Sequence, residues 1–494
     1  MKKKFLLILS LPLLLASITG CNASGSSDSN TSSVESSSES STTSATPKPT
    51  YETLEHFRLS FDADLGENEV IVKKYKGTSS TVNIPAELED NGRLYTVTTL
   101  DEGCFNGSSI SAITLPDNIT SIGKSCFANC KSLTSFSFPK QLKTIGNYAF
   151  SNTGLKTLNF NNDLKEIGEG AFYNNTSIEE ITLPNNIEKV GWLSFKNCNK
   201  IKKMTVPFIG ESKGTHPYLA YLFGAENNMH GDDVVPTGLT EVTITGKEVS
   251  PFAFYGLTHL EKVNLSENTT KIGSHAFEKC TGLMEVNGLM NVTHIDTYAF
   301  YSCTSFLDFE LSNELHYVGD RAFSYDLLTL TEYGGGYYLG NKDNPYSLFI
   351  RAIPTTDYSG FKFHDDCSFI RKAAINVISM TLPSKLKGIA EEAFYSSNCT
   401  SIIIPEGVDA LRDDAFGASK IVWAVIPSTV KISYGAFSNK LTTVYYHGTE
   451  AQWNKIVFAM TAEFDSKTIY FYSETTPTEA GNYWHYVDNV PTAW

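Results

Sequence analysis

The chain has 494 residues, with 39 Lys and Arg against 54 Asp and Glu, which gives a formal net charge of −15. This length suffices for several ordinary domains or for one long array. No basic stretch offers a stripe of phosphate contacts, so the composition argues against a nucleic-acid partner.

The first twenty residues are predicted to form an export signal. Residues 2–4 are all Lys, residues 5–15 are apolar but too few to span a bilayer, and the segment ends in ITGC (18–21). This ending resembles the signal of bacterial lipoproteins, in which the cysteine is lipidated and becomes the first residue. We therefore predict a signal peptide over residues 1–20 and a lipid on Cys21. An ordinary secretion signal followed by a chance cysteine is the alternative.

No later segment has the run of about 18 apolar residues that a membrane span needs. The lipid is thus the expected membrane anchor, and it would hold the chain on the outer face of the bacterial cytoplasmic membrane, exposed at the cell surface. Residues 21–50 are rich in Ser and Thr and contain too little apolar surface to offset the entropy cost of ordering their backbone. We expect a disordered tether there, with a span of roughly 30 Å.

One hexapeptide recurs through the rest of the chain, for example as IGNYAF (145–150), IGEGAF (167–172) and IGSHAF (272–277). Its Phe returns at steps of 21 to 23 residues within three sets. A fixed period of this size predicts a stacked-repeat architecture. The recurring residues are Phe105, Phe127, Phe150, Phe172, Phe195, Phe254, Phe277, Phe300, Phe323, Phe394, Phe416 and Phe437.

Each unit follows the pattern hxxhGxxxFxxCxxLxxhxhP, where h is aliphatic. The LxxhxhP part alternates like a short strand ended by Pro, as in IEEITLP (178–184) and VISMTLP (377–383), and AFxxC predicts a single helical or 3₁₀ turn. A single coil cannot cover its own apolar side, so neighbouring coils must cover it. We therefore expect a mostly β solenoid in which the Phe rings stack as a structural spine.

The cysteines follow the same period. Four of them lie three residues after the recurring Phe, namely Cys130, Cys198, Cys280 and Cys303, whereas Cys104 and Cys126 replace the Ala before it. A small, buried, weakly polar residue suits both places. Structural thiols are therefore predicted, although export would permit disulfides and metal ligation is a further alternative.

The unit LxxIxLPxxLxxIGxxAFxxCxxL resembles the BspA-like class of leucine-rich repeats of bacterial surface proteins. The resemblance covers residues 97–446 and recurs twelve times. It implies a right-handed solenoid of short parallel strands and single helical turns. It also implies an exposed lipoprotein or wall-associated protein that acts as an adhesin or as a partner-binding scaffold.

Several segments depart from the repeat. Residues 208–236 and 324–368 are insertions into the array. Residues 51–96 alternate like an N-terminal β cap, and the aromatic-rich residues 447–494 are predicted to form a C-terminal cap. Repeat arrays need such ends for solubility.

The outward positions of the predicted strands indicate where a partner could bind. Most are small and polar, and the column beside them alternates Glu and Lys. The last coils differ, because Ile403, Val425 and Tyr445 join Trp423 in an apolar cluster. An exposed cluster of this kind marks an interaction surface, unless the C-terminal cap covers it.

The two insertions, residues 208–236 and 324–368, are the other candidate binding regions, because both contain segments rich in Tyr and Gly. The second insertion places Tyr333, Tyr337, Tyr338 and Tyr346 in one short stretch with Gly and Asn, a composition typical of recognition loops. The alternative is that these tyrosines pack back on the solenoid.

Signatures of catalysis are absent from the sequence. There is no GxSxG, HExxH or P-loop, and the four potential metal ligands of HDDC (364–367) would point to opposite faces if they lay on a strand. We expect no enzyme activity, no cofactor and no metal. Two hypotheses remain: a surface-displayed module that binds a protein or glycan, and a structural envelope spacer without an external ligand.

Overall fold

The computed structural model describes residues 57–60, 68–90, 92–355, 358, 360–373, 379–460 and 462–494. They belong to one structural unit, Thr50–Trp494. The predicted signal peptide, Cys21 and the tether lie outside the described residues. Within the described ranges, no helix combines the length and the apolarity that crossing a membrane requires.

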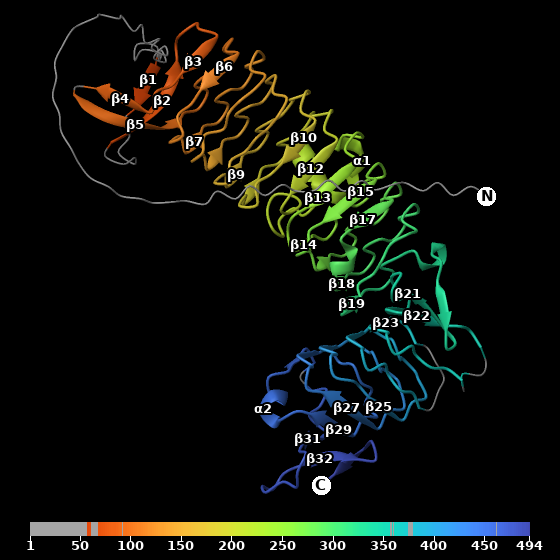
Figure 1. Ribbon diagram of the computed structural model, residues 1–494. Coiled ribbons are helices and arrows are strands. Elements are labelled where there is room, and N and C mark those ends of the chain that lie inside the picture. Colours follow the sequence, from red (N-terminus) through yellow and green to blue (C-terminus); the bar gives the residue numbers. More distant parts are fainter. Residues whose placement is uncertain are drawn as a thin grey trace, which may run out of the picture. The chain divides into compact units, whose positions relative to one another are not determined.

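The unit is a solenoid whose successive coils stack short strands in parallel (Figure 1). A repeat contributes up to two strands: one from its LxxhxhP part and one directly before the Gly of IGxxAF. The second strand was not predicted, because two residues are too few for a sequence pattern to reveal. The strand expected within 178–184 is present, whereas the described part of 377–383, residues 379–383, carries none.

Four sheets make up the N-terminal two-thirds of the array, and their strands interleave along the chain. An eight-stranded sheet contains β1 (Phe57–Ser60), β2 (Glu69–Tyr75), β4 (Glu87–Asp90), β5 (Arg93–Leu100), β7 (Ser121–Ile122), β8 (Thr144–Ile145), β9 (Glu166–Ile167) and β11 (Lys189–Val190). A two-stranded ladder contains β3 (Thr81–Asn83) and β6 (Ala112–Thr114). A five-stranded sheet contains β10 (Glu180–Thr182), β12 (Lys203–Val206), β13 (Glu241–Ile244), β15 (Lys262–Leu265) and β17 (Glu285–Asn287). A four-stranded sheet contains β14 (Glu248–Val249), β16 (Lys271–Ile272), β18 (His294–Ile295) and β19 (Tyr317–Val318).

Three further sheets follow toward the C-terminus. The first contains β20 (Thr331–Tyr333), β21 (Gly336–Leu339), β22 (Leu348–Ala352), β23 (Phe369–Ile370) and β24 (Gly388–Ile389). The second contains β25 (Ser401–Ile403), β27 (Trp423–Pro427), β29 (Thr443–His447), β31 (Thr468–Tyr472), β32 (Tyr483–Val487) and β33 (Val490–Ala493). The third contains β26 (Ala410–Leu411), β28 (Ile432–Ser433) and β30 (Val457–Phe458).

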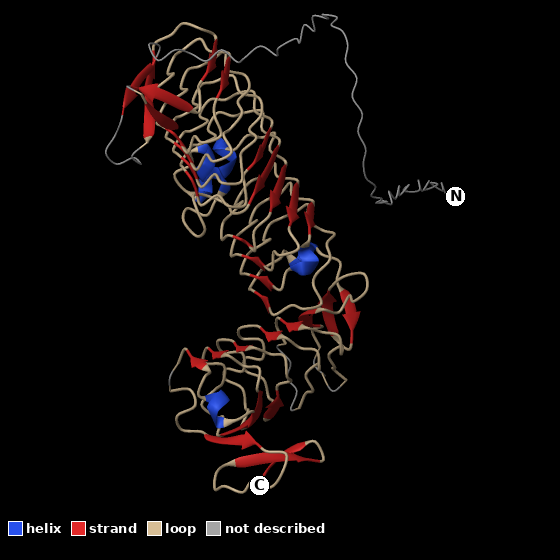
Figure 2. Cartoon of the chain, turned by 60° about the vertical axis from the view of Figure 1, so that its left-hand side comes forward, coloured by secondary structure: helices blue, strands red, loops and turns tan. Residues whose placement is uncertain are grey.

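In the part of the chain that the structure describes, antiparallel strand pairing is confined to the non-repeating segments. It joins β1 to β2, β4 to β5, β20 to β21, β21 to β22, and β32 to β33. Helices are few and short, as Figure 2 shows. Those within the described residues are the 3₁₀ helices η2 (Leu219–Phe223), η3 (Asn228–His230), η4 (Leu289–Asn291) and η5 (Tyr325–Leu327), and the α-helices α1 (Gly231–Val234) and α2 (Glu450–Trp453).

The recurring phenylalanines lie inside the coils. All twelve are buried except Phe437, which is half-buried. Within each of the three sets, neighbouring rings stack with their centroids 5.0–5.6 Å apart and their planes within 15°. Such pairs contribute about 0.5–1.5 kcal/mol each beyond the burial of their area. The rings therefore tie each coil to the next.

The turn around each Phe is a run of hydrogen-bonded turns rather than a helix. In one repeat the Cys126 N–H donates to Gly123 O and the Cys130 N–H donates to Phe127 O. Two residues of this run are left-handed, with φ of 51° at Ser125 and 62° at Asn129. Left-handed residues interrupt a right-handed helix, so the predicted helical turn does not form. Asn recurs at the second position because it tolerates positive φ better than most residues do.

The first insertion is a coil of its own and not a surface loop. Strand β12 before it pairs directly with β13 after it, Lys203 opposite Glu241. All five residues of η2 are buried, and the Phe195 N–H donates to Leu222 O just as the Phe172 N–H donates to Ser194 O one coil earlier. The buried ring of Phe223 therefore takes the place of the spine residue in this coil.

The repeat that reads FIRKAA (369–374) has lost its spine ring. The Ala373 N–H donates to Ala393 O in the way that the Phe394 N–H donates to Ala415 O, so an alanine stands at the spine position. Phe363 from the second insertion lies 6.3 Å from the ring of Phe394 and compensates for the missing side chain. A non-repeating segment thus completes the core of the last set of coils.

Candidate functional site

The buried cysteines have a structural task. The Sγ atoms of Cys130, Cys198, Cys280 and Cys303 lie 2.9–3.2 Å from the carbonyl oxygen of the Phe in the preceding coil. At the same position, Asn175 Nδ2 donates to Phe150 O at 2.7 Å. At these four coil boundaries the thiol therefore donates to a buried carbonyl, a hydrogen bond that the sequence pattern did not reveal.

The thiols are poorly suited to chemistry. All eight cysteines of the described residues are buried and free of disulfides. Burial raises the pKa of both Cys198 and Cys303 to about 12. Because the thiolate is the reactive form, these groups stay protonated and inert at neutral pH.

The HDDC segment does not form a metal site. Asp366 pairs with Lys385 at 2.5 Å, and the buried Cys367 thiol donates to Phe369 O. Among the described residues, no cluster of three or more His, Cys, Asp or Glu side chains could hold a metal ion.

The ribbon formed by β10, β12, β13, β15 and β17 carries compensated charges. Its strands place Glu180, Lys203, Glu241, Lys262 and Glu285 opposite one another in register. Lys203 Nζ lies 2.8 Å from Glu241 Oε2, and Lys262 Nζ lies 2.9 Å from Glu285 Oε2. Exposed pairs of this kind stabilise by about 0–1 kcal/mol. Their main effect is that this ribbon offers no patch of a single charge sign.

The predicted apolar cluster of the last coils is only partly exposed. Ile403 is 39% exposed, and Trp423 and Tyr445 are half-buried. The prediction was wrong for Val425, which is 2% exposed, because the larger Ile403 and Tyr445 stand opposite it on the two neighbouring strands.

The C-terminal segment covers part of this cluster. Trp484, on β32, is fully buried, and its ring lies 5.5 Å from that of Tyr445. Its Nε1 donates to Tyr446 O at 2.9 Å, which fixes the last strands against β29. The two alternatives that the sequence left open are therefore both partly correct: the cluster is covered beside Trp484 and remains accessible beside Trp423.

The sequence analysis missed further rings on the same face. Tyr470 stacks on Tyr445 at 5.4 Å, Tyr472 lies 5.2 Å from Trp484, and Tyr486 is 39% exposed and lies 4.9 Å from Trp484. The alternation in TIYFY (468–472), continued past the last recognised repeat, was the signal that could have revealed them. We call Trp423, Tyr445, Tyr470, Tyr472 and Tyr486 the C-terminal aromatic face.

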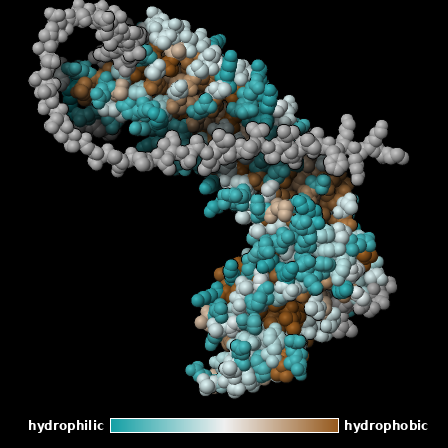
Figure 3. Space-filling view, viewed as in Figure 1, coloured by the Kyte–Doolittle hydropathy of each residue, from teal (hydrophilic) through white to brown (hydrophobic). Residues whose placement is uncertain are grey.

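A polar pair borders the C-terminal aromatic face. His447 Nδ1 lies 2.7 Å from Glu406 Oε1. Burial raises the pKa of Glu406, but hydrogen bonds from His447 and from Ser428 outweigh this effect, and the pKa is lowered overall. The face therefore combines ring surfaces with an ionised carboxylate and an imidazole. On the side of the molecule visible in Figure 3, hydrophobic residues form small patches surrounded by polar ones.

The tyrosines of the second insertion lie on a folded hairpin. The prediction of a recognition residue was wrong for Tyr338, which is fully buried and packs 5.2 Å from the ring of Phe349. Tyr333, Tyr337 and Tyr346 are half-buried. Tyr346 stacks on His364 at 3.8 Å, and the Arg351 guanidinium lies 5.5 Å above Tyr337. These rings pack to different degrees against other residues of the same insertion, because three antiparallel strands replace the expected loop.

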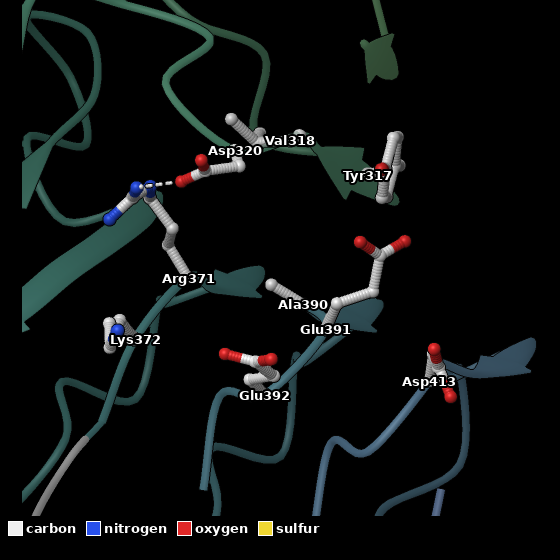
Figure 4. Close-up of a pocket in the computed structure, with 10 residues that line it drawn as sticks. Tyr317, Val318, Asp320, Arg371, Lys372, Ala390, Glu391, Glu392 and Asp413 are labelled. Carbon is white, nitrogen blue, oxygen red and sulfur yellow. Dashed lines mark hydrogen bonds and ion pairs between the residues drawn. The ribbon is translucent and has the colours of Figure 1, made fainter. Parts of the chain in front are cut away.

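A charged cavity of about 260 Å³ lies where the coils that end at β19 meet the coils that begin at β23 (Figure 4). We call this meeting place the joint. At the edge of the cavity, Arg371 Nη2 lies 2.7 Å from Asp320 Oδ1. Figure 4 shows Glu391 nearer to Tyr317 than to this ion pair. Small-molecule sites are mostly apolar, so this lining does not favour one here. The lining residues are Tyr317, Val318, Gly319, Asp320, Arg371, Lys372, Ala390, Glu391, Glu392 and Asp413.

Stacked parallel coils in which buried aliphatic and aromatic positions recur in the same register define a leucine-rich-repeat solenoid. The profile described as "BspA type Leucine rich repeat region (6 copies)" matches residues 98–214, 237–334 and 362–476. These segments make up more than half of the chain, and the protein belongs to this family. A search of curated proteins finds no match.

Similar solved structures are bacterial leucine-rich-repeat proteins. A leucine-rich cell surface protein from Faecalibacterium prausnitzii is 19% identical, with 83% of this chain and 98% of that chain covered and a TM-score of 0.31. A leucine-rich repeat protein from Bacteroides ovatus is 19% identical, with 85% and 99% covered and a TM-score of 0.31. The pneumococcal vaccine antigen PcpA is 15% identical, with 84% and 96% covered and a TM-score of 0.30.

Proposed function

We propose that this protein is a cell-surface lipoprotein whose solenoid binds a protein or glycan partner. Three observations support the proposal. The N-terminus has the pattern of a lipoprotein signal ending at Cys21, the tether would separate a folded body from the membrane, and the family is built of stacked repeats, an architecture that presents extended binding surfaces. The lipid is the proposed link to the membrane, and no nucleic acid is involved.

The C-terminal aromatic face is the observation that carries the binding hypothesis. Elsewhere the ribbon charges are paired, whereas this face combines partly exposed rings with the Glu406–His447 pair. Tyr and Trp rings offer large, rigid contact area together with a polar group, and they are enriched at binding sites. The half-buried tyrosines of the second insertion are the second proposed contact region.

The binding test uses the chain from residue 51, immobilised and exposed to a panel of host matrix proteins and of isolated cell-wall glycans. We expect saturable binding to one class, with Tyr445→Ala and Trp423→Ala each weakening it at least tenfold, since an anchor ring contributes about 2 kcal/mol or more to binding. Thr443→Ala, on the same strand as Tyr445, is the matched control and should leave the affinity unchanged. Circular dichroism checks that each variant is folded.

The anchor is tested separately in the producing cell. Metabolic labelling with a clickable fatty acid should label the full chain, and Cys21→Ala should abolish the label. If the ectodomain binds neither class of ligand, the structural spacer becomes the better description. If binding survives both aromatic substitutions, the C-terminal aromatic face is not the site.

A further inference from the structure

The joint interrupts the contacts that tie the other coils together. The ladder β14–β16–β18 ends at β19. Phe323 stacks on Phe300, but no ring contact among the described residues links Phe323 to Phe363, which precedes Phe394 in the last set. The joint therefore lacks the stacked Phe pair that connects coils within each set.

Charged side chains take over this task. Arg371 pairs with Asp320 at 2.7 Å, and Lys387 pairs with Glu314 at 3.4 Å. The Arg412 guanidinium lies 4.5 Å above the ring of Tyr317. Each contact joins a residue of the coils up to β19 to a residue of the coils from β23 onward. Their strength depends on charge, unlike the stacking of Phe rings.

Two histidines lie at the centre of the joint. His316 Nδ1 is 3.4 Å from Asp409 Oδ2, and the ring of His316 stacks on that of His294 at 5.7 Å and 14°. His294 Nδ1 also lies 2.9 Å from Thr293 Oγ1. Asp409 therefore pairs with His316, and its charge also acts on the neighbouring His294.

The charged groups that face His294 come from every neighbouring strand. Lys271 on β16 lies opposite His294 in the strand register. It pairs at 3.5 Å with Asp296, which belongs to the same coil as His294. His316 lies on the next coil, and Asp409 and Arg412 flank β26. Burial lowers the pKa of His294, as do His316 and Arg412, whereas Asp409 and Asp296 raise it, and the pKa is lowered overall.

We propose that the joint is an acid-sensitive hinge with His294 as its sensor. A proton on His294 places a new positive charge beside His316 and Arg412. The two nearby carboxylates are already paired, Asp409 with His316 and Asp296 with Lys271. When the joint opens, water reaches His294, and the imidazole then binds a proton more tightly than it does in the closed joint. The closed joint is therefore fully stable above the ordinary histidine pKa of about 6.5 and loses stability as the pH falls below it.

Hydrogen exchange of the full chain between pH 7.5 and pH 5.5 tests the hinge, after correction for the intrinsic pH dependence of exchange. We expect peptides covering residues 314–320 and 385–413 to exchange several-fold faster at the lower pH, while a peptide covering 144–172, far along the array, stays unchanged. His294→Gln should remove most of this acid response. His230→Gln, at an exposed position outside the joint, is the matched control and should retain it.

Asp409→Asn tests the same hinge from the other partner. Without this carboxylate, the joint peptides should exchange faster already at pH 7.5. Equal acid responses in the parent chain and in His294→Gln, or an acceleration spread evenly over all coils, would overturn the proposal.

Discussion

Truncation of one interior spine ring tests how the array holds together. Phe150 is fully buried, and its ring lies 5.1 Å from Phe127 and 5.5 Å from Phe172 in stacked geometry. The rings of Phe136 and Phe138 meet it in T-shaped geometry, with centroid distances of 4.7 and 5.6 Å. Phe150→Ala should therefore cost about 4–5 kcal/mol, the upper part of the range for such changes, because four ring contacts are lost together with the filled volume.

The effect should be local. In a stacked array, stability is close to a sum of terms for each coil and for its interfaces with its two neighbours. We expect the coils over residues 123–195 to lose hydrogen-exchange protection in Phe150→Ala, whereas the coils over residues 394–447 keep theirs. Urea unfolding should become biphasic, because the weakened coils melt first.

Phe160→Ala is the matched control. This ring is half-buried and meets Phe138 and Phe172 only at an angle, so its loss should cost clearly less. The nearest-neighbour reasoning is refuted if Phe150→Ala shifts one cooperative transition to lower urea and lowers exchange protection uniformly along the chain.

Three further predictions concern single groups. Asn175→Ala should destabilise by about 1–3 kcal/mol in urea, since it removes the side-chain hydrogen bond to the buried carbonyl of Phe150, and Asn175→Cys should recover part of this loss; equal stability of the two variants would contradict the role of the thiol. A thiol reagent at pH 8 should leave Cys198 and the other buried cysteines unlabelled until the chain unfolds, and rapid labelling of the folded chain would disprove their burial. The lowered pKa of Glu406 stabilises the fold above the ordinary carboxyl pKa of 4.5, and this contribution is lost as the pH falls through the lowered value; Glu406→Gln should flatten the acid limb of thermal stability measured by calorimetry, and an unchanged limb would rule this out.

Much of the fold could be predicted from the residues alone. The spacing of the Phe residues specifies which rings meet, because coils that stack in register bring together positions one period apart. The same period places Cys198 and Asn175 at one structural position, where each donates to a Phe carbonyl. These contacts are between adjacent repeats, so a pattern of about 22 residues contains both partners.

The exposure of the candidate binding residues was decided by contacts that no period describes. Trp484 bonds to Tyr446, 38 residues away, and covers part of the cluster around Tyr445. Arg371 reaches Asp320, 51 residues away, and helps to build the joint. Tyr338 is buried because the second insertion folds as a hairpin against Phe349.

The sequence by itself determined the stacked coils, because each repeat carries the apolar and turn-forming residues that its neighbours require. Only the tertiary structure decided which aromatic rings remain accessible and where charged pairs replace the spine. Those outcomes depend on how the non-repeating segments pack on the array, and they have no second copy in the chain from which a pattern could be recognised.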